Sequence, residues 1–206
     1  MPYSDFTLEE IAKKLGVTTS GAALFPTVQA IPVPAWLTVM LTKVTPLSFL
    51  TEKARSEAII SPVMMAAREI TDNRLAIFSG QRLDVDAAKG LVGECDFILS
   101  IAEPVLPLRS PLVTVVEAKK ADIELGLGQC VAQMIGARTF NAAAGQGDRP
   151  VFGCITSGEV WQFLRLSGPV AVQDTRRYPL ADLGLILGVF RAMVAAVESL
   201  TPTAAP

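Results

Sequence analysis

The sequence predicts an α/β protein in which helices pack against a mixed β-sheet of about five strands. Three observations carry this prediction. Apolar residues recur at helical spacing in several segments, short apolar β-type runs lie between them, and 50% of the 206 residues are hydrophobic. With 18% charged residues, this composition is typical of a folded chain with a large core and excludes a disordered one. The length suits one domain better than two.

The N-terminal part, residues 1–51, is expected to form a helix and an irregular arm outside the core. Residues 7–15 carry apolar side chains at the spacing of an amphipathic helix, and Gly16 ends it. Three prolines follow where the recognition helix of a helix-turn-helix would begin, so that DNA-reading motif is disfavoured. Residues 36–51 are expected to form a short helix or turn.

The core is expected within residues 52–166. A helix over 52–73 has an apolar stripe, and Pro62 predicts a kink in it. The remaining core elements are, in order, strands over 74–79 and 92–101, the strand in "LVTVVEAKK" (112–120), a helix over 123–140, and a hairpin of strands 151–156 and 160–166. Strands and helices in this order predict a mixed sheet with helices against it.

The C-terminal part, residues 167–206, is expected to form one buried helix over 180–200 and a frayed tail. Three charged residues interrupt its apolar run, which is therefore shorter than the roughly 20 residues that a bilayer requires. The N-terminus lacks the basic and apolar segments of a signal peptide. We therefore expect a cytoplasmic protein without a membrane partner.

Composition excludes several kinds of chemistry. The chain has no histidine, which excludes Ser-His-Asp and Cys-His triads and histidine-ligated zinc. Cys95, Cys130 and Cys154 are widely spaced in apolar sequence and are expected to be core residues, not a disulfide framework. A net charge of -2 without a basic run argues against a broad basic DNA-binding face. Any DNA contact must be local, assisted by a metal, or shared across an oligomer.

The end of "LVTVVEAKK" carries candidate functional residues. Side chains alternate along a strand, so Glu117 and Lys119 share one face. If the preceding strand pairs antiparallel with this one, Asp96 lies opposite Glu117 on the same side. Two carboxylates beside an ammonium suit Mg²⁺, which binds hard oxygen ligands, takes few carboxylates and keeps several waters. The carbonyl of Ala118 would complete the protein's ligands, and the lysine would orient or deprotonate the attacking water.

This order of residues resembles the PD-(D/E)XK nuclease superfamily, which has the restriction-endonuclease-like fold. "GECDFILS" followed by "VVEAKK" is similar to the family's acid on one strand and Glu-x-Lys on the next. The resemblance covers residues 52–166 and implies two more site residues. They are Glu57, which would contribute to metal binding through water or at a second site, and Gln129, with Gln133 one turn on, which would support the lysine or contact the substrate backbone. Cys95 stands where the family pattern has proline.

The resemblance implies a hydrolase: a Mg²⁺-dependent endonuclease that cleaves phosphodiester bonds of DNA. Mn²⁺ is a substitute for Mg²⁺, and a homodimer is one way to cut both strands of a duplex. One or two metal ions are equally compatible with the sequence.

Other interpretations stay open. The same fold could be a catalytically inactive module that binds nucleic acid or protein, which the acidic pI of about 5.3 favours. The two strand acids can also be interpreted as surface residues neutralised by Lys119 and Lys120, and the helical Glu57 and Gln129 as residues that face water. An enzyme acting on a small phosphorylated molecule is disfavoured, because the chain has neither a GxxxxGK[ST] nor a GxGxxG loop.

Overall fold

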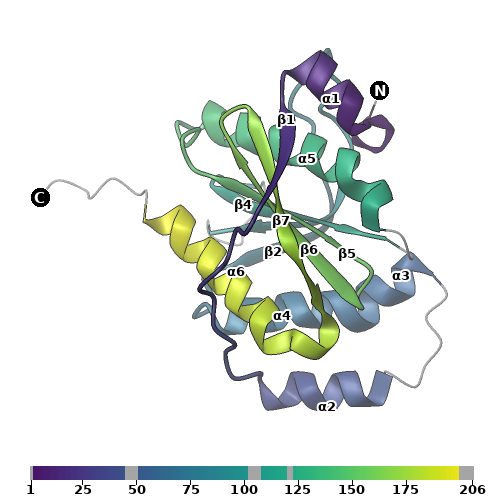
Figure 1. The fold of residues 1–206 in the computed structure, drawn as a ribbon, viewed down its shortest axis with the longest axis vertical. Helices are drawn as coiled ribbons and strands as arrows, with labels where there is room; N and C mark the ends of the chain where they lie inside the picture. Colours follow the sequence, from purple (N-terminus) through teal and green to yellow (C-terminus); the bar gives the residue numbers. More distant parts are fainter. Residues whose placement is uncertain (1, 45–50, 102–107, 120–122, 200–206) are drawn as a thin grey trace, which may run out of the picture.

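The computed structural model describes residues 2–44, 51–101, 108–119 and 123–199, which form a layered α/β structure (Figure 1). A seven-stranded mixed sheet lies in the middle, in the order β1-β7-β6-β5-β4-β3-β2. The strands are β1 (Thr18–Ala22), β2 (Ala76–Arg82), β3 (Glu94–Ser100), β4 (Leu112–Ala118), β5 (Val151–Thr156), β6 (Val160–Ser167) and β7 (Val170–Pro179). The helices are α1 (Leu8–Leu15), α2 (Ala35–Val44), α3 (Glu52–Arg55), α4 (Ser61–Glu69), α5 (Leu127–Ala143) and α6 (Leu183–Glu198).

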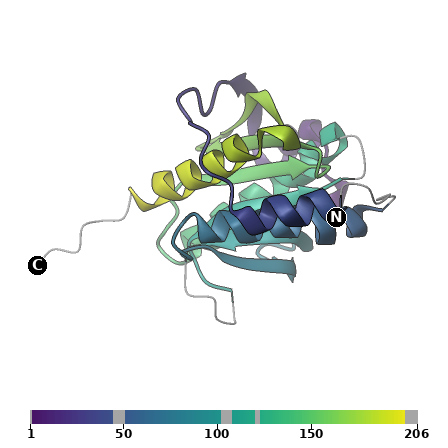
Figure 2. The ribbon, with the colours of Figure 1, turned by 90° about the horizontal axis from the view of Figure 1, so that it is seen from below.

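Helices cover both faces of the sheet (Figures 1 and 2). One hydrophobic cluster joins the sheet to α5, α1 and the N-terminal segment, and a second joins the other face to α4 and α6. Helix α2 packs on the outside of α4. All three cysteines are buried and unpaired, as expected for core residues. The α/β class predicted from the sequence is confirmed.

The strand pairings that carry the candidate site agree with the sequence. β3 and β4 pair antiparallel, and β5 and β6 form the predicted hairpin. β4 and β5 are parallel, with α5 in the connection between them, as a parallel pair requires a long crossover. The end of β4 is therefore enclosed by β3, β5 and the start of α5.

The N-terminal helix ends where the sequence predicts. The Thr7 side chain accepts a hydrogen bond from the Glu10 backbone N–H, and the Glu10 carboxylate accepts one from the Thr7 backbone N–H. This reciprocal capping satisfies donors that have no partner inside the helix. Gly16 follows at φ 65°, a left-handed conformation that glycine adopts without steric cost.

The segment predicted as one kinked helix over 52–73 is helical, but its irregularity lies before Pro62. A π-helical turn, Ser56–Ile60, separates α3 from α4, and the Ser61 N–H donates to the Ser56 carbonyl five residues back. Proline has no N–H and its ring excludes the carbonyl four residues earlier, so the widened turn accommodates it.

Two strands are additional to the predicted five. β1 has the sequence "TTSGA" and is exposed along its whole length, so no hydrophobic alternation marks it. β7 contains "QDTRRYP", in which polar residues mask the pattern of a strand. Both become strands through pairing: β7 extends the β5–β6 hairpin, and β1 pairs parallel with β7 at the edge.

One helical stretch of the described chain, Leu180–Glu198, is long and apolar enough to cross a membrane by length and composition. Its apolar side chains pack against the sheet instead: Leu187, Phe190 and Val194 are at most 1% exposed. This packing is that of a core helix in an α/β fold.

Candidate active site

The two strand acids lie near each other, where β3 begins and β4 ends. In the antiparallel ladder Phe97 lies opposite Val116, so one step further along the ladder places Asp96 opposite Glu117. Oδ2 of Asp96 accepts a hydrogen bond from the Ala118 backbone N–H at 2.7 Å. The Asp96 carboxylate of β3 is therefore held against Ala118 of β4, the residue that follows Glu117.

Three side chains hold one another beside these strand ends. Glu117 is 3% exposed, and its Oε1 accepts a hydrogen bond from Nζ of Lys119 at 2.7 Å. Its Oε2 accepts a hydrogen bond from Nε2 of Gln133 at 2.9 Å. Lys119 also donates to Oε1 of Gln129 at 3.2 Å. Both carboxylate oxygens of Glu117 therefore have a donor, which sets its orientation.

The two glutamines lie one turn apart on α5, and each contacts a different residue of the site. Gln129 contacts the lysine and Gln133 contacts the glutamate. The sequence analysis mentions Gln133 only as the residue one turn after Gln129 and predicts no separate role for it. Its spacing of four residues from Gln129 on a helix that packs against β4 is the signal that could have identified it. Oε1 of the fully buried Gln133 makes no hydrogen bond within the described residues.

A backbone hydrogen bond and close packing hold Lys119 in position. Its N–H donates to the Thr156 carbonyl at 2.8 Å, which extends the pairing of β4 with β5 by one residue. A Cβ added at Gly126 would lie 2.9 Å from the Lys119 Cε and 3.1 Å from Ile155 Cγ2. The Lys119 side chain therefore runs towards Glu117 through a narrow space, which stays open because Gly126 has no Cβ.

The site holds more acidic charge than basic charge. Burial and then the charge of Asp96 raise the pKa of Glu117 from 4.5 to about 7. Burial also raises the pKa of Asp96, although the Ala118 N–H opposes this. Burial alone would lower the pKa of Lys119, but its hydrogen bond to Glu117 and the neighbouring acids outweigh burial and raise it. The lysine is therefore an ammonium, and it does not neutralise both carboxylates.

This donor set fits a magnesium ion. Asp96 and Glu117 offer hard oxygen atoms from adjacent strands, and their excess negative charge in a buried setting favours a cation. Nowhere in residues 2–44, 51–101, 108–119 and 123–199 do three or more acidic or cysteine side chains gather closely enough to hold an ion by themselves. An ion here would use the two acids, the Ala118 carbonyl and waters, which suits Mg²⁺ because it keeps several waters.

Glu57 is not brought to this site. Its side chain is 69% exposed, its Oε1 lies 3.9 Å from Nζ of Lys53, and it lines an open pocket between α2 and α4. The helical acid whose charge acts on the site is Glu52, the exposed first residue of α3. Its charge raises the pKa of both Asp96 and Lys119. Of the two glutamates on this helical segment, the sequence analysis singled out Glu57, whose exposed side chain lines a different pocket.

The π-helical turn explains this difference. A prediction of side-chain direction assumes 3.6 residues per turn along the whole helix. Ser56–Ile60 takes an extra residue per turn, so positions within it do not follow the direction set by α3. Thr51 caps α3 by accepting a hydrogen bond from the Ala54 N–H, and this cap marks Glu52 as the first helical residue.

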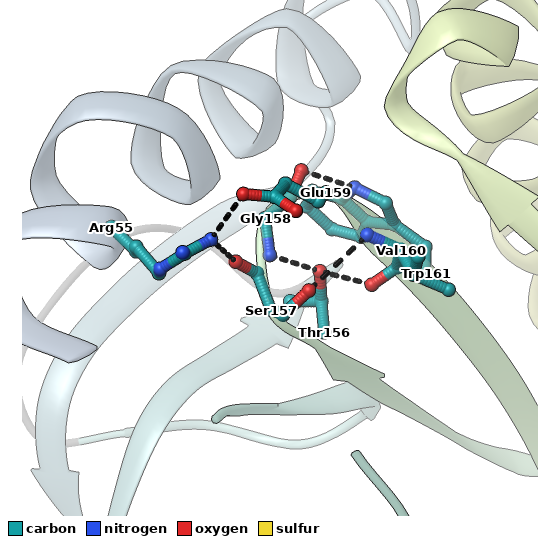
Figure 3. Close-up of polar contacts among 7 residues, drawn as sticks. All are labelled: Arg55, Thr156, Ser157, Gly158, Glu159, Val160 and Trp161. Carbon is teal, nitrogen blue, oxygen red and sulfur yellow. Dashed lines mark hydrogen bonds and ion pairs between the residues drawn. The ribbon is translucent and has the colours of Figure 1, made fainter. Parts of the chain in front are cut away.

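A tight turn between β5 and β6 ties α3 to the strands of the site (Figure 3). Nη1 of Arg55 donates to the Ser157 carbonyl at 3.0 Å and lies 2.9 Å from the Glu159 carboxylate. Within the turn, the Thr156 hydroxyl accepts from the Gly158 N–H and donates to the Val160 carbonyl. Because the Thr156 carbonyl also accepts the Lys119 N–H, this turn connects α3 to Lys119, the residue that follows β4.

The alternative in which Lys120 helps to neutralise the strand acids involves a residue outside the described ranges.

A scan against models of known protein families gives no match, and a search of curated proteins finds none that is similar. The candidate site is therefore argued from its own geometry.

Proposed function

We propose that this chain is a Mg²⁺-dependent nuclease of the PD-(D/E)XK type that hydrolyses phosphodiester bonds of DNA. The observation that carries the proposal is the buried Glu117, opposite Asp96, with the Lys119 ammonium 2.7 Å from its carboxylate. Two hard acids from neighbouring strands and one adjacent cation form a combination suited to metal-dependent phosphoryl chemistry without histidine.

In this proposal, different residues of the site bind the metal, orient the water and position the lysine. Asp96, Glu117 and the Ala118 carbonyl would hold Mg²⁺, which supplies Lewis acidity and lowers the pKa of bound water. Lys119 orients the attacking water and offsets negative charge on the phosphate, because its raised pKa keeps it protonated. Gln129 keeps the lysine in place. We assign to Glu52 the electrostatic support that the sequence prediction assigned to Glu57.

DNA as the substrate, a homodimer that cuts both strands, and a cytoplasmic location are parts of the same proposal. The surplus of acidic residues makes a broad electrostatic grip on DNA unfavourable. Contact with the phosphate backbone is therefore concentrated at the site, where the ion and Lys119 provide positive charge.

The proposal is tested by nicking of supercoiled plasmid. Wild type is expected to nick in Mg²⁺ or Mn²⁺ and to lose this activity in EDTA. Lys119→Ala is expected to nick about 100-fold more slowly, because a positioned charge or proton-transfer group contributes that much to a rate. Lys89→Ala is the matched control, since it removes an equal charge from an exposed ion pair with Asp86.

Equal nicking by wild type and Lys119→Ala would reject the proposal. Calorimetric titration with Mg²⁺ separates the inactive module from the enzyme. The enzyme binds the ion saturably and Glu117→Ala loses that binding, whereas the inactive module shows no saturable binding in either protein.

A pair of glutamates on one helical segment gives a further prediction. Glu52→Gln is expected to lower metal-dependent nicking roughly tenfold, because it removes a charge that acts on Asp96 and Lys119. Glu57→Gln is expected to leave the rate within about twofold, because its side chain is exposed and points to another pocket. Initial nicking rates at saturating Mg²⁺ measure both. A larger loss in Glu57→Gln than in Glu52→Gln would show that the helical acid is assigned wrongly.

A further inference from the structure

A second pocket lies on the other face of the sheet from Glu117. It has a volume of about 640 Å³, within the usual range for small-molecule sites. The irregular arm of residues 24–29 forms one side of the pocket, and α6 forms another. The start of β5 and the end of β6 form its floor. Figure 1 shows this arm, in dark blue, running from β1 beside α6.

Small residues on α6 create this space. A Cβ added at Gly188 would lie 2.4 Å from the Gln29 carbonyl oxygen, so the arm touches the helix backbone there. Beyond this contact, the same side of α6 presents Ala192, Ala195 and Ala196, whose short side chains leave the pocket open. The arm is held on the helix further along by the Ile31 N–H, which donates to the Gly184 carbonyl at 3.1 Å.

The floor of the pocket is aromatic. Phe25 of the arm packs against Phe152 of β5 with ring centroids 6.2 Å apart and an interplanar angle of 35°. Both rings line the pocket. A flat apolar group entering beside Phe25 would therefore contact a ring surface rather than flexible aliphatic chains.

Two arginines line the same pocket, and neither has a side-chain partner among the residues that the structure describes. Arg165 lies directly opposite Phe152 in the β5–β6 ladder, and Arg191 lies on α6. Neither side chain has a hydrogen bond or ion pair with any residue of the described ranges, and no acidic residue lines the pocket. Eight other arginines of those ranges donate side-chain hydrogen bonds. Two exposed arginines that line a pocket with an aromatic floor favour an anion with a flat body.

We propose that this pocket binds a small aromatic anion, with a phosphate or carboxylate head at Arg165 and Arg191 and a ring against Phe25. This site is separate from the candidate active site: it needs neither a metal ion nor Glu117. It therefore stands whether or not the chain is a nuclease.

Calorimetric titration with phenyl phosphate in EDTA tests the proposal. Saturable binding of one molecule per chain is expected, and inorganic phosphate and phenol, which are the head and the ring alone, should each bind at least about tenfold more weakly. Benzoate in a parallel titration distinguishes a carboxylate site, where it binds as well as phenyl phosphate, from a phosphate site, where it binds more weakly.

Variants locate the binding. The double variant Arg165→Gln, Arg191→Gln and the single variant Arg191→Gln are expected to bind phenyl phosphate at least about tenfold more weakly, because each removes a charged hydrogen-bond donor. Their thermal midpoints should match wild type, since neither side chain bonds to the described protein. Arg82→Gln, at the opposite edge of the sheet, and Glu117→Ala should bind like wild type.

Three results would overturn the proposal. They are the absence of saturable binding up to ~10 mM phenyl phosphate, equal binding by the double variant, and loss of binding in Glu117→Ala. The last result would place the anion at the candidate active site. If wild type binds phenyl phosphate as expected but shows no metal-dependent nicking of plasmid, only the nuclease proposal is rejected.

Discussion

Glu117→Gln is expected to abolish metal-dependent nicking, with a loss of roughly 1000-fold or more, and to stabilise the metal-free protein at pH 8. The loss follows because an amide cannot replace the charge of a carboxylate that binds Mg²⁺, and such an ion contributes several kcal/mol to catalysis. The gain in stability has the opposite sign because this carboxylate is buried beside a second acid.

The sign of the stability change follows from proton linkage. The pKa of Glu117 is raised from 4.5 to about 7, so between these values the folded protein binds more protons than the unfolded chain. The free energy of unfolding therefore falls as pH rises from about 4.5 to about 7, and it stays reduced above that. Glu117→Gln removes this decrease, which is on the order of 1–3 kcal/mol.

The local structure can accept the amide. Lys119 and Gln133 both donate to Glu117 in wild type, and an introduced amide would meet one of these donors with its own N–H groups. Oε1 of Gln133 lacks a partner within the described residues. Rotation of the Gln133 amide by half a turn therefore provides an acceptor for the new donor.

Thermal unfolding in EDTA at pH 5 and pH 8 measures this prediction. At pH 8 the variant should unfold at a higher temperature than wild type, and at pH 5 the difference should shrink. Adding Mg²⁺ should raise the midpoint of wild type and not that of the variant. An equal increase in both proteins would mean that the ion binds elsewhere, which would contradict the assignment of Glu117.

Asp96→Asn and Asp96→Ala are both expected to lose metal binding and nicking, again by about 1000-fold, but only the alanine variant should lose stability. Oδ2 of Asp96 accepts a hydrogen bond from the N–H of Ala118, a residue that is 2% exposed. Asparagine retains an acceptor oxygen for this N–H. Alanine leaves it buried without a partner, which costs about 1–3 kcal/mol.

Urea unfolding of the three proteins in EDTA, together with Mg²⁺ titration, separates the two roles of Asp96. The asparagine variant should unfold at the urea concentration of wild type or above it, and the alanine variant at a lower one. If the asparagine variant still bound Mg²⁺ with wild-type affinity, Asp96 would be a structural residue that orders the end of β4 and not a ligand.

Much of this candidate site was predictable from the sequence because it lies on regular strands. The period of two along β4 determines which residues share a face, and antiparallel pairing with β3 then places Asp96 opposite Glu117. The helical spacing of Gln129 and Gln133 likewise determines that both face the same strand. In each case local periodicity and a single pairing are sufficient.

The helical acid was not predictable in the same way. Glu52 and Glu57 lie on one continuous helical segment, but Glu57 lies within the π-helical turn between α3 and α4, so a period of 3.6 residues does not give the direction of its side chain. That turn depends on how Pro62 fits against the rest of the segment, and on the contact of Arg55 with the β5–β6 turn. Neither is visible in the hydrophobic pattern of the sequence.

The sequence by itself determined the α/β class, the ends of α1, the β5–β6 hairpin and the alternation that gathers Glu117 and Lys119, because each follows from local periodicity or a local cap. The tertiary structure was needed to show that "TTSGA" becomes β1, that the arm lies on α6 beside Arg191, and that the exposed Glu57 lines a pocket away from the strand acids. These features depend on hydrogen bonds and close contacts between segments far apart in the chain. Their free energies arise only when the fold brings those segments together.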